Sequence, residues 1–593
     1  MKLKNILRAS VLLVLLLWLA PTLAISQNSA HKAAAAKLLI IAPDTFIDEL
    51  DPLKRFKDAS GRPTILLSLS QVYNDFDGVD QAEEVKRCIA HYETYENVAF
   101  VMLVGDVDQF PTRYQWWGLP GQEGWGASDL YYADLYDHST GAFNDWDIND
   151  NGLYAEVEFN PDGAINNDHI DFLPDVAVGR IPASTEAEVT AYVNKVIAYE
   201  TKTTPSDAWF KQAGLYTGTW SSEDNTLKDD VAGYLSNRGF TQIIKRYTDW
   251  NTDPPQPPTA GSIIGDLNSG LGFANYAGHG ISDAWACVGL SSASLAGLNN
   301  ADMLPIAFAN ACDTGMFAWL PRAHPYIDTN GQTHCGVDNG ESLSLGAYPH
   351  PTLPRPAPIQ AGIVSCSGPL CTNCEIDRPC IAETFLFGNP TGSTGAIAYV
   401  GARSGARPGQ SMDLDRHFFR AYESGINVLG NMWKYMLARY YEQHNLGDSH
   451  NWFYDTSKWE AGHTLVEPQK YILFGDPSLV AGGVFTATQS GSVWDSAGGP
   501  WLGYHRYRIT GDVSIPTGTA LTVHAYASVL FESGRKITAM GSDDGDGLAV
   551  NGTTDMPAYL ISTAAEPQSE HAVRGIKVAG QIRVRSGGNI KLW

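Results

Sequence analysis

Basic residues are scarce in this chain. It carries 40 lysines and arginines against 65 aspartates and glutamates, which gives a formal net charge of −25 over 593 residues. A chain of this charge repels phosphates, so nucleic acid is excluded as an expected partner. Hydrophobic residues make up 44% and charged residues 18%, a composition typical of globular proteins. The length exceeds what a single core supports, and we expect about three or four domains.

Long apolar segments are also scarce. Val11–Ala20 follows a lysine- and arginine-containing start and precedes small residues ending at Ala24, the pattern of a signal peptide. A membrane anchor is the alternative, but this run is short for a bilayer span and no second run follows. We therefore expect residues 1–24 to be a signal peptide. The mature protein is then secreted or held at the cell surface, without a membrane span.

Cysteine is rare, with eight in the whole chain, and the eight are unevenly spread. In an exported protein, a local cluster is more often used for disulfides than for a zinc knuckle, although the spacing allows both. Connectivity stays open, and isolated cysteines are expected to be free thiols. The cluster contains Cys335, Cys366, Cys371, Cys374 and Cys380, and the isolated residues are Cys88, Cys287 and Cys312.

Short apolar runs alternate with helical segments from Lys37 onward. Runs such as KLLIIA and VAFVMLVG indicate parallel strands that are covered on both faces by helices. Thr185 and Glu188 form a capping box that predicts the start of one helix. We expect an α/β fold with an N-terminal subdomain at 37–205 and a second subdomain at 206–483.

Two regions depart from this pattern. Residues 317–380 are rich in proline and glycine, include the cysteine cluster, and show no helical or strand period, which predicts a long surface insertion. Residues 484–593 alternate glycine, threonine, serine and valine, and this texture predicts a C-terminal all-β domain. A β-solenoid and a small sandwich both fit this domain.

His279 and Cys312 each follow an apolar run and precede a glycine, in YAGHG and FANACDTG. The carboxyl ends of parallel strands meet at one edge of a sheet, where ligands bind, so an imidazole and a thiol there can reach one substrate carbonyl. A histidine can take the thiol proton and later protonate a leaving amine. The backbone N–H of Gly280 can hold an oxyanion. The structural alternative is a buried cysteine and a turn histidine, which spacing alone favours.

These two blocks resemble the catalytic blocks of the gingipain family of cysteine peptidases. The motifs VMLVGDVDQFP, SDLYYADLYD, PDVAVGRIPASTEAEV, CIAETFLFGNPTGSTGAIAYVG and YILFGDPSLV resemble family blocks in the same order, roughly from Lys37 to Gly482. The resemblance implies a caspase-like fold with two α/β subdomains and catalysis in the second. It also implies that Cys312 is the nucleophile, that His279 is the general base and acid, and that the amides of Gly280 and Cys312 hold the oxyanion.

The chain departs from the family pattern in three places. A glutamate orients the histidine in gingipains, and Glu223 is a weak candidate for that role here. Aligning across a gap places Asp224 near the aspartate that lies at the bottom of the S1 pocket in arginine-cleaving members; an exposed loop acid is an equal alternative. The expected preference for a basic P1 residue therefore depends on this placement of Asp224. We also expect no long inhibitory segment before Lys37, and the insertion at 317–380 can reshape the cleft.

The stretch DWDINDNGLYAEVE predicts a calcium loop. Asp147, Asn149, Asn151 and Glu158 supply alternating oxygen ligands, and a glycine allows the sharp turn. The flanks do not read as two helices, so this is not an EF-hand, and an acidic turn is the alternative. We expect structural Ca²⁺ and no organic cofactor.

The leading hypothesis is a secreted cysteine endopeptidase that acts on proteins or peptides. One alternative is a catalytically silent adhesion or binding protein whose β domain does the work. A second is a transpeptidase that uses the same Cys/His dyad but transfers the acyl group to an amine rather than to water. Nothing in the sequence indicates the oligomeric state.

Overall fold

The computed structural model describes most of the chain between residues 36 and 483, together with eleven strands between 485 and 591. The gaps before 484 are 61, 108, 119–123, 151–153, 161–162, 167, 169, 319–324, 328–332, 336–378, 389–391, 445 and 447–462. The predicted signal peptide and Cys366, Cys371 and Cys374 lie outside the described residues. No helix within the described part is long and apolar enough to cross a membrane.

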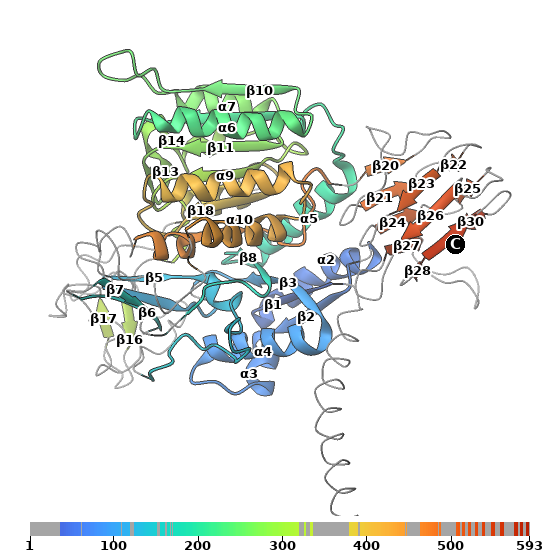
Figure 1. Cartoon of the computed structure of the whole chain (residues 1–593), viewed down its shortest axis with the longest axis horizontal. Coiled ribbons are helices and arrows are strands. Elements are labelled where there is room, and N and C mark those ends of the chain that lie inside the picture. Colours follow the sequence, from blue (N-terminus) through green and yellow to red (C-terminus); the bar gives the residue numbers. More distant parts are fainter. Residues whose placement is uncertain are drawn as a thin grey trace, which may run out of the picture.

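One ten-stranded sheet runs through both predicted subdomains (Figure 1). Its interior strands are short runs of apolar residues that are buried along their length, as expected for strands covered on both faces. In spatial order the strands are β10 (Gln242–Arg246), β9 (Gln212–Thr217), β11 (Phe273–Ala277), β15 (Ile306–Asn310), β18 (Ala398–Ala402), β19 (Tyr471–Phe474), β8 (Ala177–Ile181), β3 (Val98–Val104), β1 (Lys37–Ala42) and β2 (Thr64–Ser68).

The sheet is mixed rather than wholly parallel. All neighbouring pairs are parallel except β18 and β19, which are antiparallel. The connection between these two strands contains two helices, α9 (Gln410–Glu423) and α10 (Leu429–Gln443), instead of one. The second helix carries the chain back to the edge where β18 ended, so β19 must run in the opposite direction. The carboxyl ends of β11, β15 and β18 therefore share an edge with the amino end of β19.

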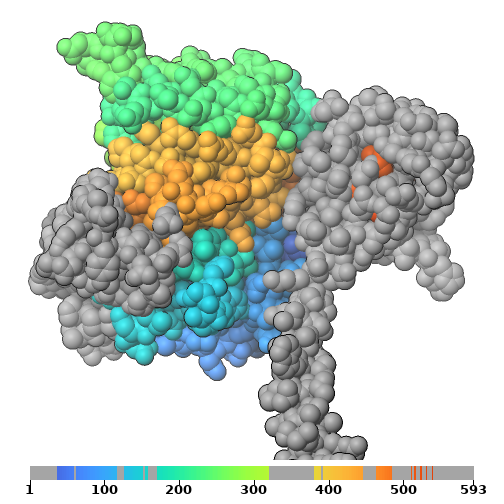
Figure 2. Space-filling view, in the orientation of Figure 1, coloured from blue at the N-terminus to red at the C-terminus, as the bar shows by residue number. Residues whose placement is uncertain are grey.

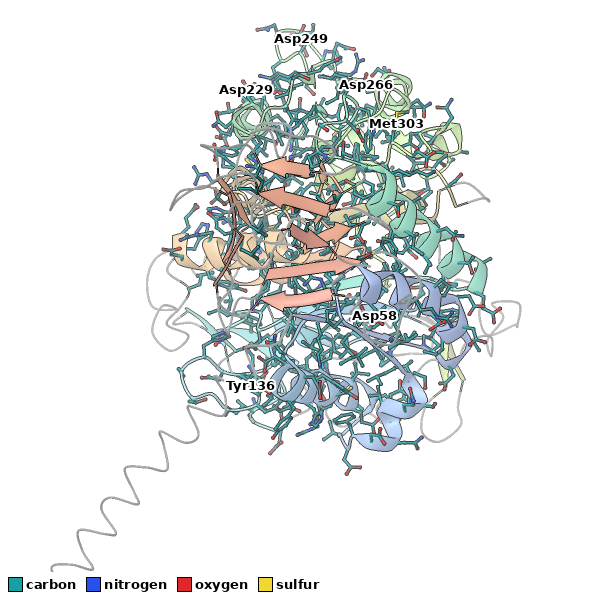
Figure 3. All side chains as sticks on the ribbon, turned by 90° about the vertical axis from the view of Figure 1, so that its right-hand side faces the viewer. Asp58, Tyr136, Asp229, Asp249, Asp266 and Met303 are labelled. Carbon is teal, nitrogen blue, oxygen red and sulfur yellow. The ribbon has the colours of Figure 1, made fainter. Side chains whose placement is uncertain are left out.

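Helices cover both faces of the sheet. Asp229 of α6 and Asp266 of α7 lie on opposite sides of it (Figure 3). Figure 2 shows α9 and α10, in yellow to orange, on the face of the second subdomain that adjoins the blue first subdomain. The helices are α2 (Ile47–Ala59), α3 (Leu69–Asp75), α4 (Gln81–Glu96), α5 (Glu186–Lys202), α6 (Glu223–Asn237), α7 (Ala260–Asn268), α8 (Ile381–Phe387), α9 (Gln410–Glu423) and α10 (Leu429–Gln443). The predicted capping box at the start of α5 is present.

Smaller sheets lie at the edge of the large sheet where the carboxyl ends of β11 and β15 are found (Figure 1). The hydrogen bond from Arg403, just after β18, to Gln115 of β4 (Tyr114–Gly118) joins one of these sheets to that edge. They contain β4 (Tyr114–Gly118), β5 (Gly124–Ala127), β6 (Tyr154–Asn160) and β7 (Gly163–Asn166), then β12 (Gly280–Ile281), β13 (Ala284–Trp285) and β14 (Leu290–Ser291), and finally β16 (Pro325–Ile327) with β17 (Thr333–Cys335) in the predicted insertion.

The described residues after 484 are strands that pair mostly in parallel. β21 pairs with β24 and β24 with β27, while β22 pairs with β25 and β23 with β26. In each of these pairs a strand lies beside the third strand after it in the chain. The all-β domain and its solenoid or sandwich form stay predictions. The strands are β20 (Phe485–Ala487), β21 (Arg506–Ile509), β22 (Val513–Ile515), β23 (Ala520–Val523), β24 (Ser528–Phe531), β25 (Lys536–Ala539), β26 (Gly547–Asn551), β27 (Ala558–Ser562), β28 (Gly575–Val578), β29 (Gln581–Val584) and β30 (Asn589–Lys591).

A buried ion cluster ties the start of the chain to the end of the sheet. The ammonium of Lys57, in α2, lies 3.0 Å from a carboxylate oxygen of Glu200, in α5, and also pairs with Asp476, just after β19. All three side chains are essentially unexposed. The backbone N–H and the hydroxyl of Ser478 also donate hydrogen bonds to the carboxylate of Asp476.

We expect Lys57→Met to lower the free energy of unfolding by about 3–5 kcal/mol, because it removes the buried cation that pairs with both Glu200 and Asp476. Urea denaturation of the purified chain measures this. Lys54→Met is the matched control on the same helix, since Lys54 pairs with Asp58 at the surface, and it should change the value by less than about 1 kcal/mol. Equal effects of the two substitutions would contradict a central role for the buried cluster.

Candidate active site

His279 lies in the turn that follows β11. Its backbone is held on both sides: the N–H donates to the Cys287 thiol at 3.3 Å, and the carbonyl accepts from the Ala286 N–H at 2.9 Å and the Tyr276 hydroxyl at 2.8 Å. Gly278, directly before it, has a φ of 155° in a region that favours glycine. The backbone of His279 is thereby fixed while its side chain stays exposed.

The imidazole of His279 packs against an aromatic ring. The Trp220 ring centroid lies 5.8 Å from it, with an interplanar angle of 35°. Trp220 belongs to the loop between β9 and α6, which leaves the same edge of the sheet as β11. A half-buried indole restricts the positions that the imidazole can take, so Trp220 is a residue of the site that the sequence analysis did not identify.

Cys312 follows β15, the neighbour of β11 in the sheet. Its thiol lies against the backbone of Ala406, 3.3 Å from the N–H and 3.7 Å from the carbonyl oxygen. Burial raises the pKa of Cys312, and the negative charges of Asp313 and Glu467 raise it further, whereas the Ala406 N–H and Lys470 act in the opposite direction. The thiol is thus protonated at neutral pH and needs a base to become a nucleophile.

The two loops meet at Gly280. A Cβ built on Gly280 would overlap the carbonyl oxygen of Cys312 and would lie 2.8 Å from a methyl carbon of Thr314. Only a residue without a side chain allows this approach. Within the described residues no hydrogen bond joins the thiol to His279, so the structure brings together the loops of the predicted dyad without a direct bond between the two side chains.

A buried ion pair supports the loop that contacts the thiol. Lys470 and Glu467, on the segment leading into β19, lie 2.9 Å apart and are almost fully buried. Lys470 donates to the Gly405 carbonyl at 2.7 Å, and Glu467 accepts from the Arg407 N–H at 2.9 Å. Both contacts bracket Ala406, and they depend on the antiparallel course of β19, which brings this segment to the same edge.

Glu223 and Asp224 differ sharply in their surroundings. Glu223 is exposed at the first position of α6, with no hydrogen bond from its side chain to His279. Asp224 is fully buried, and one of its carboxylate oxygens has no hydrogen-bond partner. Burial raises the pKa of Asp224 to about 6, although Lys228 lowers it. The reading of Asp224 as an exposed loop acid is therefore wrong, because the helix N-terminus turns its side chain inward.

Besides lowering the pKa of Asp224, Lys228 interacts directly with two other buried side chains. Its ammonium lies 2.6 Å from Asp415, and it also donates to the side-chain oxygen of Asn275, in β11. The Asn275 amide donates in turn to Asp415 at 2.7 Å. This buried network under β11 has no periodic signal in the sequence, since its members come from α6, β11 and α9.

The predicted calcium loop is only partly described. Asp147 and Asn149 lie in the described residues, Asn151 does not, and Glu158 is described only as a backbone position in β6. Among the described histidines, cysteines and acids, no group of three or more could hold a metal ion. Calcium stays a prediction.

Asp168 is a buried acid beside the predicted loop. Burial raises its pKa to about 7, and Asp147 and Glu156 raise it further. Its carboxylate accepts from the N–H groups of Ile148 and Glu156 at 3.1 and 2.7 Å, and so fixes the turn around Asp147.

Four of the described cysteines are free thiols: Cys88, Cys287, Cys312 and Cys380. Three of these are the isolated cysteines of the sequence. Cys380 belongs to the cluster, and it is buried at the N-cap of α8. The disulfide and zinc hypotheses for the rest of the cluster fall outside the described side chains.

We expect Gly280→Ala to lower the free energy of unfolding by about 1–3 kcal/mol, because its Cβ forces the two loops apart. Chemical denaturation measures the loss. Gly261→Ala, in α7, is the control: an added Cβ there meets nothing within 4 Å, and the helix gains roughly 0.5–1 kcal/mol. A Gly280→Ala protein as stable as the wild type would rule out the close approach.

We expect Asp313→Asn to lower the pKa of Cys312, because it removes a negative charge that disfavours the thiolate. The rate of alkylation of Cys312 by iodoacetamide at pH 7.5 should then rise severalfold, and its pH profile should move to lower pH. Mass spectrometry separates Cys312 from the other thiols. Asp302→Asn, on an exposed residue at the opposite edge, should leave the profile unchanged. A slower reaction in Asp313→Asn would reverse the assigned sign.

Comparisons with known proteins show which proteins the chain is similar to. Lys-gingipain of Porphyromonas gingivalis is 25% identical over 330 residues, which make up 52% of this chain and 16% of that protein. Gingipain R2 of the same organism is 24% identical over 292 residues, 48% of this chain and 33% of that protein. The chain thus matches no more than a third of the length of these two relatives.

Two solved structures share the fold. The crystal structure of the Arg specific cysteine proteinase gingipain R (RgpB) aligns with a TM-score of 0.51 at 18% identity, covering 77% of this chain and 83% of that one. The complex of Porphyromonas gingivalis RgpB pro- and mature domains gives the same TM-score and identity and 85% coverage of that chain. The model of Peptidase family C25 matches residues 31–332, more than half of the sequence. The chain belongs to Peptidase family C25, the family of the gingipain-like cysteine peptidases.

Proposed function

We propose that the protein is an exported cysteine endopeptidase that uses Cys312 and His279. The observation that carries the proposal is the contact of Gly280 with the Cys312 carbonyl, which holds the histidine and cysteine loops together at the carboxyl ends of adjacent strands. Membership of a peptidase family supports the same activity.

The proposed reaction begins with transfer of the Cys312 thiol proton to His279. The thiolate attacks the carbonyl carbon of the scissile bond, and the N–H groups of Gly280 and Cys312 stabilise the oxyanion. His279 then protonates the leaving amine, and water hydrolyses the thioester to release the acid product and the thiol. Because the thiol lies against Ala406 in this structure, it must exchange that contact for the imidazole before the first step.

We propose a preference for a basic P1 residue, with Asp224 as its partner. The support is chemical: Asp224 offers a buried carboxylate oxygen that lacks a hydrogen-bond partner, and a buried acceptor of this kind favours a cationic donor. Similar proteins named for lysine and arginine specificity are consistent with this choice. Since Asp224 is fully buried, a P1 side chain reaches it only if the loop between β9 and α6 moves. Glu223, in the same turn, remains the proposed residue for orienting His279.

The peptidase proposal is tested by labelling the purified mature protein with peptidyl acyloxymethyl ketones that carry Arg, Lys, Asn or Asp at P1. We expect an adduct on Cys312, formed fastest with Arg or Lys and slowed at least a hundredfold in His279→Ala. Mass spectrometry locates the adduct, and Cys312→Ala is the blank. Asp224→Asn should remove the preference for basic P1 groups and leave the slower labelling by the Asn probe in place.

Other outcomes separate the competing functions. No adduct with any probe, in a protein shown to be folded, would favour a silent binding protein. An adduct that an added amine releases faster than water does would favour transpeptidation. Glu223→Gln should lower the labelling rate without changing the P1 order if Glu223 orients the imidazole, and an unchanged rate would remove it from the site.

We also propose structural Ca²⁺ bound by the loop that contains Asp147, Asn149, Asn151 and Glu158. Calcium at millimolar concentration should raise the melting temperature, and a chelator should lower it. Asp147→Asn should reduce this difference, while Asp58→Asn, at the exposed end of α2, should preserve it. A melting temperature that does not respond to calcium or chelator would exclude the ion.

A further inference from the structure

A cavity lies at the opposite edge of the sheet from Cys312 and His279. Its volume is about 270 Å³, and its walls come from α5 and from the turns that precede β15 and β18. Figure 3 views this side of the molecule, with Met303, from the turn before β15, labelled. The lining residues of α5 are Ala191, Asn194, Lys195, Ala198, Tyr199 and Lys202, and the two turns contribute Ala301, Asp302, Leu304, Gly392 and Ser393.

Lys195 is the buried charged residue of the cavity wall, with 4% of its surface exposed. Its ammonium donates to the carbonyl oxygens of Leu386, in the last turn of α8, and Thr394, the latter at 2.8 Å. An ammonium has three donors, so two are satisfied by backbone and one remains. Burial lowers the pKa of Lys195 to about 7, with no neighbouring charge that raises it.

Lys195 has no carboxylate within ion-pair distance among the described residues, whereas five other deeply buried lysines and arginines each have one. Lys86 is also buried without such a carboxylate, but its ammonium lies over aromatic rings, 4.2 Å from the ring centroid of Tyr131 and 5.4 Å from that of Trp146, whereas Lys195 lines the cavity. A buried ammonium without an anion is costly, and it either loses its proton or acquires a counter-ion. The five paired cations are Lys57, Lys228, Lys470, Arg113 and Arg180.

We propose that this cavity binds a small oxyanion, a carboxylate or phosphate group, which supplies the missing counter-ion of Lys195. Lys202 stands at the rim, where it pairs with Asp302 at 2.9 Å on exposed side chains. It adds a second positive charge that an incoming anion can share. Ala191, Ala198 and Leu304 give the walls an apolar character, so the ligand carries an uncharged part beside its anionic group.

The site is independent of the peptidase reaction. It lies at the amino ends of β15 and β18, whereas Cys312 lies at the carboxyl end of β15. A protein that proved inactive as a peptidase would still bind the anion, and a protein that did not bind the anion would still be labelled at Cys312.

The test is isothermal titration of the full mature chain with sodium phosphate and with sodium citrate, against sodium chloride of equal ionic strength. We expect saturable one-to-one binding of at least one oxyanion, weakened tenfold or more in Lys195→Met and severalfold in Lys202→Met. Lys54→Met, on α2 and outside the cavity, should bind as the wild type does. The preferred probe tells whether the natural ligand carries phosphate or carboxylate.

Ala198→Phe provides a second variant that fills the cavity and keeps Lys195. It should abolish binding while circular dichroism shows an intact fold, and it decides the question if Lys195→Met does not fold. Undiminished affinity in a folded Lys195→Met or Ala198→Phe protein would overturn the proposal. So would the absence of saturable binding of both probes to the wild type.

Discussion

The close approach of Gly280 to the Cys312 carbonyl is the constraint on which the site depends. Adjacent parallel strands place their loops near one another, but side chains normally keep such loops several ångströms apart. Removing the side chain at one position lets backbone meet backbone, so the histidine turn rests on the cysteine turn. Tyr276, Cys287 and Ala286 then fix the histidine backbone from the other side. The imidazole is placed by its fixed backbone and by its contact with Trp220, and not by a hydrogen bond to the thiol.

The segment that leads into β19 provides the second support of the site. Gln469 contacts β4 and the Ser128 hydroxyl of the first subdomain, while Lys470 and Glu467 hold the loop around Ala406. Three parts of the chain that are remote in sequence therefore converge beside the thiol. The balance of charges there matters, because a single lysine opposes two carboxylates in setting how readily Cys312 ionises.

The sequence was most informative where a pattern is local. Apolar runs such as Phe273–Ala277 and Ile306–Asn310 predicted buried parallel strands, and Thr185 with Glu188 predicted the capped start of α5; the structure confirms these. The reversal at β19 was missed, because strand direction depends on how many helices separate two strands. Trp220, Ala406 and the Lys228 network were missed as well. Their roles arise from contacts between residues far apart in the chain, and no spacing records such contacts.

The order of the sheet also sets the order in which the molecule can be completed. β8 ends at Ile181, yet its partner β19 begins only at Tyr471, after most of the second subdomain. During synthesis the four strands β1, β2, β3 and β8 therefore present an unpaired edge, on β8, until β19 emerges. Exposed edges of this kind recruit other chains. The insertion and the helices between Ile181 and Tyr471 thus lengthen the interval during which the nascent protein is exposed to aggregation.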